Sequence, residues 1–302
     1  MYIPLAEISK SIFGYGEIES HYEAIVWLKR IPHTFMALIA GIGLSISGLI
    51  MQTIFRNPLA GPFVLGVSSG ASFGVAILLL GGLSIGIGIP VAASTGAMGT
   101  LLLISFFAKK INSSSSILII GLMLSYFVSA FTSFLVSIST AEEVQSFSLW
   151  NLGDFSKVSL TEIAGLSLIV VSSVIYFLFR HKAYSIYLLG DTYAQSLGVS
   201  PIQLRTISVI VVGILAGTIT AYCGPIAFVG ISVPHLARSI SKRSNHQSYI
   251  INSIFIGAIF MLLCDILCEN PFLQQTLPIN SITCLFGAPV VIWIMYKTAT
   301  PK

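Results

Sequence analysis

Residues 34–55 read TFMALIAGIGLSISGLIMQTIF, a stretch without a charged side chain. Because an α-helix rises about 1.5 Å per residue, roughly 20 apolar residues cross the ~30 Å hydrocarbon core of a bilayer. This stretch therefore predicts a membrane-spanning helix. Outward from it, length and lack of charge predict nine such segments, at residues 34–55, 63–82, 85–108, 116–139, 163–179, 206–224, 225–240, 249–268 and 278–296.

The seventh segment, residues 225–240, differs from the others. It is short, begins at a Gly224-Pro225 pair, and holds His235 and Arg238. Irregular backbone is tolerated at membrane depth only where protein or a water-filled path surrounds it. We therefore predict a half-helix or a re-entrant element at this place.

The composition also indicates a lipid environment. Of 302 residues, 55% are hydrophobic and only 9% are charged, whereas a soluble globular chain carries about 25% charged residues. Water does not solvate a surface so poor in charge, which excludes a soluble protein. The net charge of +4 does not indicate nucleic-acid binding, because the basic residues lie in scattered pairs between apolar runs. Cys264 and Cys268 lie one helical turn apart without a nearby histidine or second pair, so we expect buried small hydrophobic residues.

Lysine and arginine predict the orientation, because cytoplasmic loops carry an excess of both. The loops on one side hold eleven basic residues and those on the other side hold four. The first set is Arg56, Lys109, Lys110, Arg180, Lys182, Arg205, Arg238, Lys242, Arg243, Lys297 and Lys302, and the second is Lys10, Lys29, Arg30 and Lys157. We predict a multi-pass protein of the inner (cytoplasmic) membrane with a cytoplasmic C-terminus. Residues 1–30 are too mixed to span and are expected to form an external N-terminal segment.

Catalytic patterns are absent. The sequence has no GxxxxGK[ST] phosphate loop, no HExxH and no nucleophile elbow, so we expect neither an enzyme nor a bound cofactor or metal. Asp265 is the only carboxylate deep in an apolar segment. An intramembrane acid is a candidate proton or ion site. Because it lies a few residues from the outer end of its helix, a capping or snorkelling role is the alternative.

Irregular polar motifs follow one another along the chain. They are Arg30-Ile-Pro-His33, Phe55-Arg-Asn-Pro-Leu-Ala60, Leu65-Gly-Val-Ser-Ser-Gly-Ala71, Leu189-Gly-Asp191, Ala194, Leu197-Gly198, Gly224-Pro-Ile-Ala-Phe-Val-Gly230, Pro234-His-Leu-Ala-Arg238, Leu277-Pro278 and Gly287-Ala-Pro289. In this order and spacing the chain resembles the FecCD-type permeases of ABC importers for iron-siderophore complexes, haem and cobalamin. The resemblance runs from about residue 25 to the C-terminus.

Residues 185–200 form a short amphipathic stretch between two basic flanks. On its own, such a stretch predicts a helix that lies flat on the membrane. The resemblance implies instead the coupling helix, which docks into a groove of the ATPase subunit. The residues to which the resemblance assigns ATPase coupling are Gly190, Asp191, Ala194, Leu197 and Gly198.

The resemblance also implies a docking site for an external substrate-binding protein. Arg30 matches the first of two arginines that meet acidic residues of that partner, and His33 lies where the second is expected. Glu269 replaces a basic residue common near the same rim. The alternative for Arg30 is a helix-end anchor among lipid headgroups.

Helix breaks are the third set of candidate residues. Asn57-Pro58 ends a helix, because the residue before proline avoids the helical region. Gly224-Pro225 and Gly230 interrupt a membrane helix, which requires partners for the freed backbone groups. His235 either lines a path or is a hydrogen-bonded histidine at a helix end. The candidates for helix breaks and the translocation path are Asn57, Pro58, Gly224, Pro225, Gly230, Pro234 and His235.

Together these features predict one all-α domain, residues 1–302, built as a polytopic transmembrane helix bundle. The resemblance implies ten helices per subunit, so we expect the first of them to be absent from this chain. It also implies a homodimer or a heterodimer with a related permease, two cytoplasmic ATP-binding subunits and an external binding protein. The substrate would be an iron-siderophore complex, haem or a cobalamin. The alternatives are an ion-coupled secondary carrier that uses Asp265 and a non-transporting membrane scaffold.

Overall fold

The structure is a computed structural model that describes residues 4–14, 20–82, 86–111, 113–241, 245–269 and 277–299. Of the basic residues used to predict the orientation, Lys242, Arg243 and Lys302 lie outside the described residues. The described residues form helices and short connections, without a strand. The expected all-α fold is therefore confirmed.

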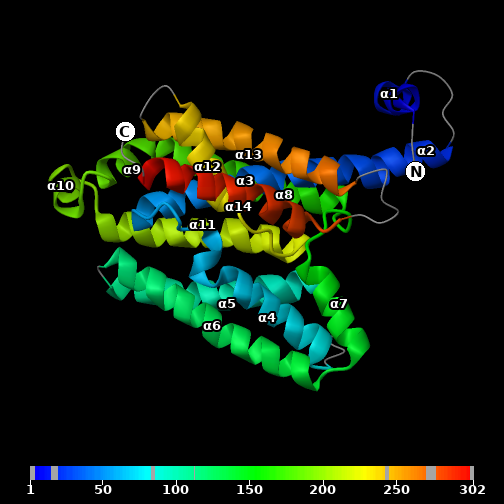
Figure 1. Cartoon of the computed structure of the whole chain (residues 1–302), viewed down its shortest axis with the longest axis horizontal. Coiled ribbons are helices and arrows are strands. Elements are labelled where there is room, and N and C mark those ends of the chain that lie inside the picture. Colours follow the sequence, from blue (N-terminus) through cyan, green and yellow to red (C-terminus); the bar gives the residue numbers. More distant parts are fainter. Residues whose placement is uncertain are drawn as a thin grey trace.

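Fourteen α-helices and two other helical turns make up the described chain, in the order shown in Figure 1. They are α1 (Leu5–Phe13), α2 (Ser20–Ile25), the π-helical turn η1 (Val26–Arg30), α3 (Ile31–Phe55), the 3-10 turn η2 (Pro62–Leu65), α4 (Val67–Leu80), α5 (Ile89–Lys110), α6 (Ser114–Ile138), α7 (Ala141–Asn151), α8 (Leu160–Phe179), α9 (His181–Tyr187), α10 (Asp191–Ser196), α11 (Pro201–Cys223), α12 (Val229–Ile240), α13 (His246–Cys268) and α14 (Ile279–Ala299).

Each of the nine predicted segments contains a helix, and in the described residues seven helices are long and apolar enough to cross a membrane. The two shorter ones are α4, with 14 residues, and α12, with 12 residues. The α4 helix begins only at residue 67, because Gly66 takes a left-handed conformation with φ 74° after the 3-10 turn. The α12 helix is the half-helix expected from its Gly-Pro start.

The first segment begins earlier than the sequence predicts. The helix runs without a break from His21 to Phe55, over 35 residues. Lys29 and Arg30 interrupt the apolar pattern, and Pro32 cannot donate a helical hydrogen bond and clashes with the carbonyl four residues before it. The π-helical turn Val26–Arg30 lies directly before Pro32. A wider turn at this place lets the helix continue through the proline.

The α3 helix is the centre of the bundle. Most of its residues are buried, from Met36 to Phe55, and α8, α11, α12 and α13 pack around it. Two glycines permit the closest approaches: Gly41 faces the backbone of Gly257 in α13, and Gly48 faces the carbonyl of Gly230 in α12. A side chain at either position would overlap the neighbouring backbone. The packing of α3 therefore combines close backbone contacts at these glycines with large buried side chains such as Leu49 and Met51.

A second layer consists of α4, α5 and α6, which Figure 1 shows beside the α3 group. Here Gly70 and Gly74 of α4 lie against Gly96 of α5, and α11 packs against α5 to join the layers. The outer helix α6 exposes Phe127 and Phe131 among other apolar residues. In the predicted membrane, exposed aromatic residues of this kind contact lipid or another subunit.

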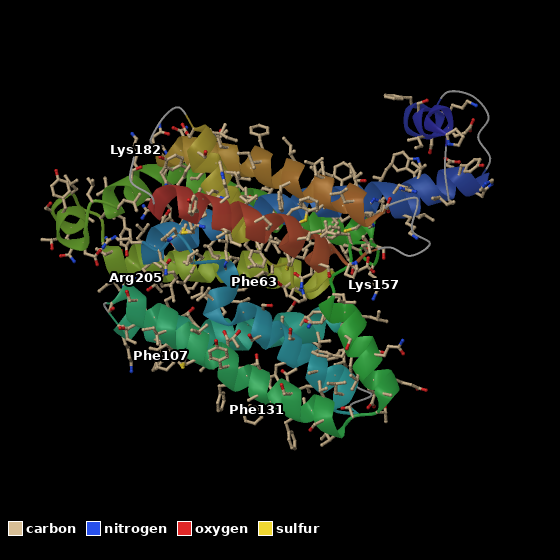
Figure 2. The ribbon with its side chains drawn as sticks, in the orientation of Figure 1. Phe63, Phe107, Phe131, Lys157, Lys182 and Arg205 are labelled. Carbon is tan, nitrogen blue, oxygen red and sulfur yellow. The ribbon has the colours of Figure 1, made fainter. Side chains whose placement is uncertain are left out.

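The bundle has two polar ends. The α10 end holds α9, α10 and the last turn of α3, and the α7 end holds α7 and the first turn of α3. Figure 2 shows Lys182 and Arg205 at the α10 end and Lys157 at the α7 end. This separation follows the two basic sets that predict a cytoplasmic α10 end.

Candidate functional site

The segment for which the resemblance implies ATPase coupling projects from the α10 end of the bundle (Figure 1). Its helix has six residues, and glycines with positive φ flank it: Gly190 at 117° and Gly198 at 79°. Glycine adopts these angles without strain, so both bends are sharp. Ala194 is buried against the body, whereas Tyr193 and Leu197 are 55% and 52% exposed. The five predicted coupling residues thus lie together on one protruding turn.

The α9 helix fixes the base of this protrusion. Tyr184 and Tyr187 are fully buried. The Tyr184 hydroxyl lies 2.7 Å from Ser208 Oγ in α11, and the Tyr187 hydroxyl donates to the Ile54 carbonyl at 3.0 Å. Burial raises the pKa of the Tyr184 phenol, so this hydroxyl stays neutral and keeps its proton for hydrogen bonding. Sequence analysis did not identify either tyrosine.

Ionic contacts join α10 to two other helices. Arg56, just after α3, pairs with Asp191 at 2.5 Å and donates to the Tyr187 carbonyl at 2.7 Å. Arg205 of α11 lies 3.5 Å from the other carboxylate oxygen of Asp191. The sequence predicted Arg56 and Arg205 only as cytoplasmic basic residues. The one sequence feature that indicated this contact was the position of the acidic residue Asp191 between basic flanks.

The turn after α3 contains the predicted helix break. Asn57 Oδ1 accepts a hydrogen bond from the Leu59 amide at 2.9 Å, which closes the turn around Pro58. His235 of α12 is buried and donates from Nε2 to the Pro58 carbonyl at 2.9 Å. Nearby, Arg238 donates to Gln52 Oε1 at 2.6 Å. The structure thus brings the Asn57-Pro58 break and His235 together. His235 has a hydrogen-bond partner, but it lies in the middle of α12 (Val229–Ile240) and not at a helix end.

Gly224 and Pro225 separate α11 from α12, with Gly224 at φ 74°. Backbone groups near this break have partners in the loop after α7 and in α14: the Asp154 amide donates to the Cys223 carbonyl at 2.9 Å. Asn280 accepts from the Ala227 amide at 3.0 Å. Farther along α12, Gly230 and Pro234 are buried, and Gly230 lies against Pro62 and the α3 backbone. Asn280 belongs to this arrangement, although no motif in the sequence indicated it.

At the α7 end, the two predicted docking residues pair with α13. Arg30 lies 2.5 Å from Glu269, and His33 Nε2 lies 2.7 Å from Asp265 Oδ1. A cleft of about 370 Å³ opens beside them, lined by Lys29, His33, Asp154, Phe155, Asp265 and Glu269.

Asp265, the candidate ion site, thus has a partner at the end of its helix. It is buried and paired with His33. Its carboxylate contacts another helix rather than the end of its own, so the pair is a contact between α3 and α13 and is neither the cap nor the snorkelling side chain predicted from the sequence. Cys264 and Cys268 beside it are buried and free, as expected for small hydrophobic residues.

Comparisons with known proteins agree with the motifs. A family model described as the FecCD transport family matches residues 1–297. Relatives include the vitamin B12 import system permease protein BtuC of Salmonella arizonae, 32% identical over 284 residues that cover 93% of this chain and 86% of that protein. BtuC of Citrobacter koseri is 33% identical over 278 residues, with 91% and 84% covered.

Solved structures show the same architecture. A structure described as an inward-facing conformation of a metal-chelate type ABC transporter is 29% identical, with a TM-score of 0.85 and 97% of each chain covered. PsaBC from Streptococcus pneumoniae, at 16% identity and a TM-score of 0.58 over 97% of this chain and 95% of that one, shares the fold alone. Together with the family model, these matches confirm the resemblance: the chain belongs to the FecCD transport family and is a membrane-spanning permease subunit of an ABC importer, not itself an enzyme.

Proposed function

We propose that this chain lines the translocation path for an iron-siderophore complex, haem or a cobalamin. The observation that carries the proposal is the protruding α10 segment, a short helix between two sharp glycine bends at one end of a multi-pass bundle. A transport bundle driven by a separate ATPase needs such a surface for its motor. The vitamin B12 permeases among the relatives support the substrate class.

The α10 segment is the proposed contact with a cytoplasmic ATP-binding subunit. Its exposed Tyr193 and Leu197 present an apolar surface about one helical turn wide, which suits helix-in-groove recognition. The excess of Lys and Arg at this end supports a cytoplasmic location for it and for the C-terminus. ATP-driven closure of two ATPase subunits would then push on the α10 segment, which holds the coupling residues Gly190, Asp191, Ala194, Leu197 and Gly198.

The path is proposed to follow the region where α12 meets the end of α3. Asn57, Pro58 and His235 form one hydrogen-bonded group there. Gly224, Pro225, Gly230 and Pro234 give α12 an irregular backbone that can move without breaking a long helix. Alternating access would be a tilt of packed helices around this group, as in other transporters. The complete path would form between this chain, as one domain, and a second copy or a related permease.

At the α7 end, Arg30 and His33 are the proposed docking residues for an external substrate-binding protein. Arg30 is 46% exposed in its side chain, so a partner carboxylate can approach it. His33 is largely covered, with a side chain 14% exposed, and contributes at most the floor of the docking surface.

Uptake of labelled ferric siderophores, haem and cobalamin tests the proposed function. A deletion strain should lose uptake of one compound and regain it when this chain is restored. A second strain restored with His235→Gln should take up the same compound more slowly if His235 belongs to the path. Unchanged uptake of every compound after deletion would reject the proposed substrates.

A further inference from the structure

The contact of Asp191 with two arginines goes beyond surface docking. Its carboxylate faces Arg56 with one oxygen and Arg205 with the other, at 2.5 and 3.5 Å. Arg56 follows the central helix α3, and Arg205 lies in the second turn of α11. We propose that Asp191 is a positioning residue that transmits movement of α10 to both helices during ATP-driven transport.

The backbone at Arg56 supports a role for its side chain. Arg56 has φ 47°, a left-handed angle that favours glycine. A glycine would relieve the backbone but would lose every contact of the guanidinium. That group binds the Tyr187 carbonyl and lies over the Tyr187 ring, 4.5 Å from its centre. The arginine is thus held in a fixed direction, toward Asp191, by contacts that are independent of the ion pair.

Arg205 is the second arginine that contacts Asp191, and burial fixes its position. It is only 1% exposed and donates to the Ile111 carbonyl at 3.2 Å. An arginine buried this deeply cannot move without moving the start of α11. Asp191 therefore bridges a fixed cation of α11 and an oriented cation at the end of α3.

Besides this contact, α10 packs against α9 and α11, to which short connections also join it. Ala194 is its only buried residue, and an alanine carries little packing surface. Asp191 does not act as a cap, because no side chain caps the N-terminus of this six-residue helix. A negative charge at the N-terminus of a helix is favourable, but the effect on so short a helix is small. This effect would not require contacts with two arginines from distant segments. The geometry therefore fits a mechanical role better than a local one.

The inference rests on the proposed contact between α10 and an ATPase subunit, and both can be tested in the complete importer reconstituted into lipid vesicles. Substrate transported and ATP hydrolysed are measured in the same sample. Asp191→Asn keeps the size of the side chain and removes its charge. We expect the ratio of substrate to ATP to fall about threefold to tenfold, with the ATPase subunit still bound. Arg56→Gln should give a similar loss, and the double variant should be little worse than either alone.

The matched control is Glu162→Gln, which also replaces a first-turn acid by its amide. In the described part of the chain, Glu162 bonds within its own capping box, to Ser159, and glutamine serves that box equally well. The Glu162→Gln variant should leave the ratio of substrate to ATP unchanged.

A normal ratio in Asp191→Asn would overturn the inference while leaving the importer function intact. Loss of the ATPase subunit from Asp191→Asn but not from Arg56→Gln would also overturn it, because Asp191 would then contact the partner directly. Absence of ATP-dependent transport in the unmodified complex would instead reject the proposed function.

Discussion

The two ends of the bundle use the same kind of interaction in different settings. At the α10 end, Asp191 meets Arg56 and Arg205 in one shared contact. At the α7 end, Arg30 and His33 of one continuous helix meet Glu269 and Asp265 of α13 in two separate pairs. The two ends differ in how the helices joined by these ion pairs otherwise pack. The α3 and α13 helices pack along much of their length, whereas α10 is a six-residue helix with one buried residue, Ala194, and packs against α9 and α11.

An ion pair therefore has a different consequence at each end. Between α3 and α13 it adds to packing that already fixes their positions, so its loss should appear as a change in stability. At α10 the proposed role of the ion pairs is to transmit movement of the helix, so their loss should appear as a change in transport per ATP. Both expected effects require that α3, which links the two ends, behaves as a rigid element.

The largest expected effect comes from disturbing α3 itself. Gly48 lies against the Gly230 carbonyl of α12, so Gly48→Val would force a branched side chain into a backbone contact. Overpacking of this kind costs about 3 kcal/mol or more where backbone must move. We expect little folded protein, and both ends should be affected together. Yield of monodisperse protein in detergent, by size-exclusion chromatography, is the measurement.

Gly165→Ala is the control for this substitution. Gly165 lies in α8 with no atom near the position of a Cβ, so alanine should fold at least as well as glycine. A folded, stable Gly48→Val protein would show that α3 and α12 can separate without loss of the fold. The view of α3 as a rigid link between the two ends would then be wrong.

The next largest effect is expected at the buried pair of the α7 end. The side chains of His33 and Asp265 are 14% and 11% exposed, and removing one partner leaves the other buried without its hydrogen bond. A double-mutant cycle of His33→Gln and Asp265→Asn should show a coupling energy of about 1–3 kcal/mol in the free energy of unfolding. Unfolding by SDS in mixed micelles measures it. Transport per ATP should remain normal in variants that fold, and a loss of it would place this pair in the coupling mechanism.

Much of this architecture followed from the sequence because lipid imposes a simple rule. Segments of about 20 apolar residues must be helices, so the spans and the broken α12 were predictable from length, charge and the Gly224-Pro225 pair. The early start of the first helix was not predictable. Lys29, Arg30 and Pro32 resemble the end of a helix in sequence, and only the π-helical turn before the proline shows otherwise.

From the sequence it was possible to predict which residues belong to the site, but not which residues they contact. The resemblance to FecCD-type permeases implied roles for Asp191, Arg30 and His33, but their partners lie on other helices. For the α7 end a signal did exist: Arg30 and His33 are spaced three apart and Asp265 and Glu269 four apart, so each pair occupies one helix face. Joining the two faces still required knowing that α3 and α13 are neighbours. The same lack of tertiary information hid Arg205, which in sequence is one basic residue among many.

The smallest effect on stability is expected at the exposed pair, and here the two partners can be distinguished. Arg30 and Glu269 have side chains 46% and 31% exposed, so either Arg30→Gln or Glu269→Gln should change the free energy of unfolding by only about 0.2–1 kcal/mol.

The rate of association with the external binding protein should distinguish the two variants. Arg30→Gln removes the proposed docking charge and should slow association, mainly at low salt, because charges at the rim of an interface act on the association rate. Glu269→Gln removes the acid that competes for Arg30 and should not slow it. Surface plasmon resonance at two salt concentrations measures both rates. Equal rates for the two variants and the unmodified protein would mean that Arg30 serves the α3–α13 contact alone, and the functional difference between the two ends would then be greater.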